Sequence, residues 1–161
     1  MHGTLPDTMC HAKNLEALIL YGLSTGSDCR DKYMYGFSTE HSFGGSFPSC
    51  VLQMPQLTTL LLSSNLLTGK FDRAAELNNR LIELDLSHNL LTGNIPDNIQ
   101  NHTWVLLDLS HNKLNGVMRS TLFDKTILPL NITVAPPVLS LTSNRLSGVI
   151  PNSVAKLINV D

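Results

Sequence analysis

Leucines alternate with other residues in several short stretches of this chain of 161 residues. The stretch LIELDL at 81–86 is the clearest case, and LTTLLL at 57–62 and WVLLDL at 104–109 have the same spacing. A period of two is typical of a strand that buries one face and exposes the other. We therefore predict several short strands, each too small to bury its apolar face alone.

These stretches belong to a longer repeat, LxxLxLxxNxLxGxIP. It occurs at 57–71, 81–96, 104–118 and 138–151. Its asparagines, separated by 24, 23 and 32 residues, are Asn65, Asn89, Asn112 and Asn144. The third spacing is longer than the others, so we expect its extra residues to loop out. Stacked repeats would share one continuous apolar core.

Weaker repeats precede these four. GTLP at 3–6 matches the end of one repeat, and LEALIL at 15–20 matches the strand of the next, which then has Leu23 where asparagine is expected. A third ends in HSFGGSFP at 41–48, with His41 in the asparagine place. We count about six repeats, with the first and the last cut in mid-unit.

The polar and special residues of the repeat have separate expected roles. The asparagine is expected to turn inward and bond to backbone groups of the turn and the adjacent coil, forming a structural ladder. Each backbone group left unpaired would cost about 1–3 kcal/mol. The glycine permits a sharp turn, and the proline after it sets an extended direction.

The motif LxxLxLxxNxLxGxIP resembles the plant-type leucine-rich repeat of receptor-like or secreted ectodomains of plants, algae and protists. The resemblance covers most of the chain, is strong from about residue 44 onward, and is weak across 21–43. It implies a leucine-rich-repeat solenoid, either α/β or mostly β. The expected shape is a curved right-handed coil, with a concave parallel β-sheet and short strands or 3₁₀ turns behind it.

We predict a single domain over 1–161. Its degenerate repeats occupy 1–48, its regular repeats 49–118, a loop excursion 119–137 and the last repeats 138–161. Neither end has the polar or cysteine-paired cap that protects a solenoid core, so both ends are expected to be incomplete. The chain would then belong to a longer protein or contact a neighbouring subunit.

The first break in the repeat, at 21–41, is polar and lies among the three cysteines. An odd count permits at most one internal disulfide. Cys29 and Cys50 could bridge the two ends of this break, and Cys10 to Cys29 is the other pairing we considered. Alternatively, all three cysteines are small buried side chains of the stacked core.

Two sequons favour an extracellular or cell-surface location. They are Asn101-His102-Thr103 and Asn131-Ile132-Thr133. Asn101 is expected on the coil side, where relatives commonly carry glycans and the concave sheet stays free. The alternative is an unmodified surface asparagine. The N-terminal residues lack the features of a signal peptide.

Composition excludes several functions. The chain is 42% hydrophobic and 15% charged, with a net charge of −2. It has no basic stripe of the kind that nucleic-acid binders need, and no apolar run long enough for a membrane span. No catalytic motif such as HExxH occurs, so we expect no enzyme activity, cofactor or metal.

The outward positions of the predicted concave sheet are the candidate binding residues. They are Thr59, Leu61, Ser63, Glu83, Asp85, Ser87, His88, Leu106, Asp108, Ser110, His111, Ser140 and Thr142. Stacking should bring Asp85 next to Asp108 and His88 next to His111. Acids beside histidines suggest metal or acid–base chemistry, but both copies lie in LDLSHN, and the repeat itself explains them.

Two functions follow from this reading. The first is a non-catalytic recognition module that binds a peptide, glycan or protein on the concave face. The alternative is a structural unit of an extracellular wall, appendage or filament, which associates with itself or neighbouring subunits through its uncapped ends.

Overall fold

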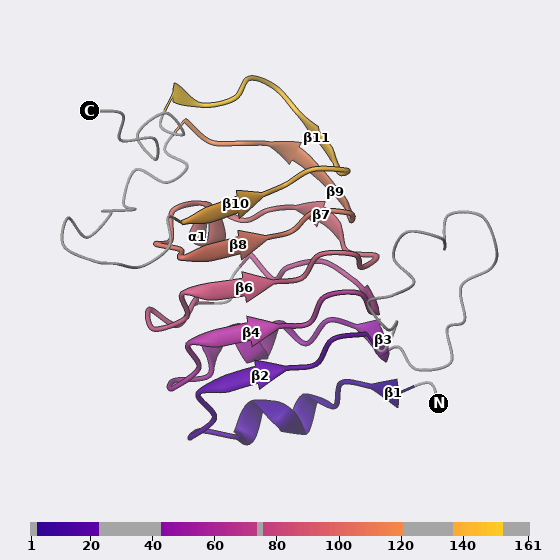
Figure 1. Ribbon diagram of the computed structural model, residues 1–161, viewed down its shortest axis with the longest axis vertical. Helices are drawn as coiled ribbons and strands as arrows, with labels where there is room; N and C mark the ends of the chain where they lie inside the picture. Colours follow the sequence, from indigo (N-terminus) through magenta and orange to yellow (C-terminus); the bar gives the residue numbers. More distant parts are fainter. Residues whose placement is uncertain (1–2, 23–42, 74–75, 121–136, 153–161) are drawn as a thin grey trace.

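The computed structural model describes residues 3–22, 43–73, 76–120 and 137–152. Its strands stack one above another as the chain winds through successive coils (Figure 1). The concave sheet is parallel and has the order β10-β8-β6-β4-β2. Its strands are β2 (Ala17–Ile19), β4 (Thr59–Leu61), β6 (Glu83–Asp85), β8 (Leu106–Asp108) and β10 (Val138–Ser140). The predicted leucine-rich-repeat solenoid is therefore confirmed.

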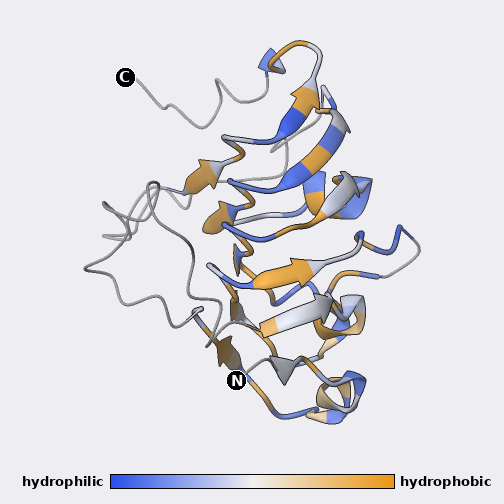
Figure 2. Ribbon diagram, turned by 90° about the vertical axis from the view of Figure 1, so that its right-hand side faces the viewer, coloured by the Kyte–Doolittle hydropathy of each residue, from blue (hydrophilic) through white to orange (hydrophobic). Residues whose placement is uncertain are grey.

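Two smaller parallel sheets follow the concave one along each coil. The first has the order β1-β3-β5 and the second β11-β9-β7. Their strands are β1 (Gly3–Thr4), β3 (Phe43–Ser46), β5 (Leu66–Thr68), β7 (Thr92–Asn94), β9 (Lys113–Val117) and β11 (Arg145–Ser147). Short helical turns, at η1 (Asp7–His11), η2 (Ser49–Gln53) and α1 (Asp97–Gln100), lie on the side away from the concave sheet (Figure 2).

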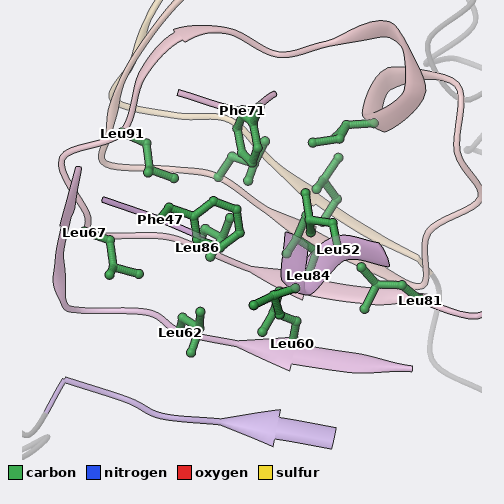
Figure 3. Close-up of a cluster of buried hydrophobic side chains, with 14 of the residues drawn as sticks. Phe47, Leu52, Leu60, Leu62, Leu67, Phe71, Leu81, Leu84, Leu86 and Leu91 are labelled. Atoms are coloured by element: carbon green, nitrogen blue, oxygen red, sulfur yellow. The ribbon is translucent and has the colours of Figure 1, made fainter. Parts of the chain in front are cut away.

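The core lies between the concave sheet and the helical turns. Register pairs place Leu60, Leu84 and Leu107 directly above one another, and each is at least 99% buried. Labelled leucines from several coils converge on the aromatic pair Phe47 and Phe71, whose rings meet edge to face (Figure 3). Burial of each such side chain contributes roughly 1.5–3 kcal/mol.

The asparagine ladder is present as predicted. Asn89 donates from Nδ2 to the carbonyls of Leu62, Leu86 and Ser87, at 3.0, 3.1 and 3.0 Å. Its Oδ1 accepts the backbone N–H of Leu67 at 3.0 Å. The equivalent bonds are made by Asn65, Asn112 and Asn144. One side chain per coil thus joins the backbone of its own coil to that of the preceding coil.

The two early repeat fragments form a single coil. β2 pairs directly with β4, and β3 pairs directly with β5. LEALIL and HSFGGSFP therefore belong to one repeat, and the prediction of a separate third repeat was wrong. Gly22 and Phe43, which flank the break, both contact the next coil: Gly22 donates to Ser63 O, and Phe43 donates to Asn65 Oδ1. The concave sheet therefore continues across the break without an additional strand.

The disulfide joins Cys10 of η1 to Cys50 of η2, with their Cα atoms 5.8 Å apart. The predicted Cys29–Cys50 bridge and its Cys10–Cys29 alternative were therefore wrong, as was the reading of all three as free core residues. Consecutive coils bring η1 and η2 side by side, whereas Cys29 lies outside the described residues. The bridge links η1 covalently to η2 and so joins two consecutive coils.

Candidate ligand-binding face

The outward side chains of the concave sheet form two regular rows. The first row runs through Thr59, Glu83 and Leu106, which are register partners. The second runs through Leu61, Asp85, Asp108 and Ser140. All seven side chains are half-buried. The structure thus brings these candidates together on one face, as predicted.

The carboxylates of this face are held in place by the chain itself. Asp85 Oδ1 accepts the backbone N–H of Ser87, and Asp108 Oδ1 accepts that of Ser110, both at 2.9 Å. Glu83 Oε2 accepts the Thr59 hydroxyl at 2.8 Å. Within the described residues, neither aspartate carboxylate makes a further hydrogen bond or ion pair. Each therefore keeps one carboxylate oxygen available to a ligand.

Two of the predicted contact residues are not on the surface. Ser87 is 6% exposed and Ser110 is 5% exposed, because the chain turns inward after each strand. Their carbonyls accept hydrogen bonds from ladder asparagines. The prediction that these serines face a ligand was wrong. Ser63 is half-buried and Thr142 is exposed, so these two remain accessible.

His88 and His111 stack at the edge of the face, with ring centroids 4.0 Å apart and planes inclined by 12°. Their φ angles, 52° and 53°, lie in the left-handed region. Burial and the nearby His111 lower the pKa of His88, while Asp108 and Asp85 oppose this shift. Protonation of His88 is therefore disfavoured. Among the described residues, no three His, Cys, Asp or Glu side chains are grouped to hold a metal.

The first coil adds an apolar region that the sequence reasoning missed. Ile19 is 50% exposed and Tyr21 is 51% exposed, and Ile19 is the register partner of Leu61. The alternation in LEALIL, with Leu18 and Leu20 facing inward, already contained this signal. The described strands of the concave sheet contain no Lys or Arg. Apolar side chains thus lie beside carboxylates on one face of the described sheet.

Comparisons with known proteins agree with this architecture. The sequence profile of the family described as Leucine Rich Repeat matches residues 80–102 and 138–157. The Arabidopsis receptor kinase HAESA, solved with the peptide hormone IDA and the co-receptor SERK1, is 29% identical over 93% of the chain, with a TM-score of 0.66. One chain of the BIR3–SERK2 complex from Arabidopsis thaliana is 33% identical over 70% of the chain described here, with a TM-score of 0.55. The chain is a plant-type leucine-rich-repeat protein.

A plant ice-binding protein also has this fold, with 24% identity over 96% of the chain and a TM-score of 0.71. This leucine-rich-repeat chain spans 21% of the HAESA chain, 57% of the matched BIR3–SERK2 chain and 42% of the ice-binding protein. No protein with a curated description matches it in sequence.

The first sequon of this leucine-rich-repeat protein lies away from the concave strands. Asn101 caps the C-terminal end of α1 and is half-buried, while Thr103 is exposed. Between them, His102 contacts Leu81 O through Nε2 and packs against Trp104, with ring centroids 4.5 Å apart. Burial lowers the pKa of His102, and the bond to Leu81 opposes this shift. Asn131 of the second sequon lies outside the described residues.

Proposed function

We propose that this chain is a non-catalytic recognition module whose concave sheet binds a peptide or protein partner. The observation that carries the proposal is the uncovered face itself, where Ile19, Tyr21 and Leu61 lie beside Glu83, Asp85 and Asp108. Apolar surface contributes to affinity when a partner covers it, and unpaired carboxylates select a partner with basic groups. HAESA, which has the same fold, was solved with a peptide hormone.

The spacing of the face suits an extended ligand. Equivalent side chains on neighbouring parallel strands lie about 4.8 Å apart. A ligand that crosses the coils would meet apolar side chains over β2 and β4, and carboxylates over β6 and β8. A basic side chain near Asp85 and Asp108 would be held by two carboxylates that are already oriented by their own backbone bonds.

An extracellular location is part of this proposal. A disulfide such as Cys10–Cys50 is characteristic of oxidising compartments, and the sequon at Asn101 would place a glycan clear of the concave sheet. No helix in the described part of the chain is both long and apolar enough to cross a membrane. Intact mass before and after glycosidase treatment tests this location, and an unglycosylated, reduced native protein would contradict it.

The binding function can be tested with a displayed library of random linear peptides, selected on the immobilised protein. We expect the selected peptides to be rich in basic and aliphatic residues. Asp108→Asn and Ile19→Ser should each weaken their binding about tenfold, the loss of about 1.4 kcal/mol. Lys113→Ser, on β9, is the matched control. Equal binding by all variants would show that the peptides bind elsewhere.

The alternative function, a structural unit that associates with its own copies, can be tested by light scattering. Light scattering over a range of protein concentrations should show a monomer if the chain acts through its concave face. Concentration-dependent growth, unaffected by Asp108→Asn or Ile19→Ser, would instead favour a structural unit that associates with its own copies.

A further inference from the structure

A polar cavity of about 480 Å³ lies on the smaller sheets, away from the concave one. We call it the lateral cavity; it is lined by Lys70, Phe71, Arg73, Thr92, Gly93, Asn94 and Asn115. These residues come from β7, from β9 and from the segment after β5. A second cavity of about 550 Å³ shares Arg73 and Asn94 with it. Volumes of this size are within the range of small-ligand sites.

Four side chains of the lateral cavity have unused hydrogen-bonding groups. Neither Lys70 nor Arg73 has an ion pair or hydrogen bond to any described residue, and the side-chain amides of Asn94 and Asn115 have none either. By contrast, Gln100 in the second cavity is satisfied, since it donates to Ile95 O and accepts from Arg119 N. Donors and acceptors are therefore concentrated in the lateral cavity.

Two glycines lie beneath side chains that line the lateral cavity. A Cβ placed on Gly93 would lie 3.0 Å from Lys70 Cγ, and one placed on Gly116 would lie 2.9 Å from Asn94 Cγ. Both glycines have positive φ angles, of 80° and 91°. The Lys70 stem and the Asn94 amide thus lie directly over bare backbone. These contacts limit the positions that the two side chains can adopt.

The charge of the lateral cavity selects an anion. Lys70 and Arg73 line it, and the described residues of its wall include no Asp or Glu. In the adjoining cavity, Asp97 is neutralised by its ion pair with Arg119. A guanidinium group can hold a carboxylate through two parallel hydrogen bonds. The lateral cavity therefore has the opposite charge preference to the concave face.

The described backbone at the start of β7 is bonded on both sides. Leu90 N donates to Leu67 O, and Thr92 N donates to Gly69 O, which joins β7 to the preceding coil. β7 and β9 pair on the other side. The side chains of the lateral cavity supply its cations and its carboxamides. Carboxamides both donate and accept, which matches the hydroxyl groups of a sugar.

From these observations we propose that the lateral cavity binds an acidic oligosaccharide. Arg73 and Lys70 hold the carboxylate of a uronic acid, and Asn94 and Asn115 bond to hydroxyls of the same or the next sugar. This site is independent of the concave face, so failure of the recognition function described above would leave it intact.

The probe for this site is tri-galacturonate, with its methyl ester as the matched neutral sugar and inorganic sulfate as a simple anion. Calorimetric titration of the folded chain should show saturable binding of tri-galacturonate. The methyl ester should bind at least tenfold more weakly. Sulfate should compete poorly, because it cannot reach the two amides in the same way. Added salt should weaken the binding, since both cations are exposed.

Variants locate the site. Arg73→Gln and Asn94→Ala should each lower the affinity about tenfold, while Arg145→Gln, a cation of β11 outside the lateral cavity, and Asp108→Asn should leave it unchanged. Circular dichroism confirms that each variant is folded. Absence of saturation, equal binding of the ester, equal binding of sulfate, or the same loss in Arg145→Gln would each overturn the proposal.

Discussion

The regular coils and the first coil, which contains β2 and β3, are joined to their neighbouring coils by different interactions. In the regular coils, Asn89 and Asn112 are buried, and each bonds to the backbone of its own coil and of the preceding coil. In the first coil the sequence has Leu23 in the ladder position, and Leu20 O is bonded by Asn65 of the next coil. The Cys10–Cys50 bridge joins these two coils covalently.

A departure from the repeat motif therefore does not by itself end the stacking of coils. A coil without its own ladder residue is retained by side chains of its neighbour, by close backbone contact and by a disulfide. The stability of the regular coils depends on buried polar bonds, whereas that of the first coil depends on the link to its neighbour.

The largest effect is expected when the ladder is broken in a regular coil. Asn89→Ala would leave one backbone N–H and three carbonyls without this partner, so we expect a loss of about 4 kcal/mol. Asn144→Ala, at a half-buried rung, is the matched control and should cost about 1 kcal/mol. Urea unfolding measures both, and equal losses would contradict the dependence on burial.

Removal of the disulfide should destabilise the first coil. The bonded cysteines are 40 residues apart, and a closed loop of this size contributes about 2–4 kcal/mol to the free energy of unfolding. We expect Cys10→Ser with Cys50→Ser to lose this amount in urea unfolding without added reductant. Cys29→Ser is the control and should cost much less. A larger loss for Cys29→Ser would point to another pairing.

Gly22 tests the close contact between the first two coils. A Cβ added there would lie 1.4 Å from Ser64 O, so the backbone must move. We expect Gly22→Ala to cost about 1–3 kcal/mol in thermal or urea unfolding. Gly44→Ala, whose nearest contact would be 3.9 Å away, should be tolerated better. If both variants unfold alike, this contact is not essential to the first coil.

The smallest effect concerns pH. The pKa of His88 and that of His102 are lowered, so the folded chain favours their neutral forms. Their contribution to stability is present above the ordinary histidine pKa, near 6.5, and is lost as the pH falls through the lowered values. We expect the melting temperature to fall from pH 7.5 to pH 5, and to fall less in His102→Gln.

The outcome that contradicts this prediction is specific to His102. If the melting temperature of His102→Gln falls between pH 7.5 and pH 5 as much as that of the parent chain, the pH sensitivity does not come from His102.

Much of the fold followed from residue patterns because each pattern has a local cause. Alternation of leucines predicted the strands, and the repeated asparagine predicted the ladder and the pairing of Asp85 with Asp108. Contacts between coils were harder to predict. The cysteine pairing depends on which helical turns become neighbours, and the burial of Ser87 depends on how sharply the chain turns after β6.

The lateral cavity was not predicted for a related reason. Its four polar side chains have no shared motif, and they meet only because Lys70, Asn94 and Asn115 take successive places around adjoining turns. Charge along the sequence, which is mixed throughout, does not show that the two sides of a coil differ in sign.

β2 pairs directly with β4, and β8 pairs directly with β10. The number of residues between two strands therefore does not determine how they pair in the concave sheet. Steps of 42, 24, 23 and 32 residues between successive inward leucines all advance the sheet by one strand. Residues added where the two longer steps occur would change what the molecule presents at its edges, while the rows on its concave face kept their order. The number of residues in these two steps is therefore not what sets the order of the concave strands.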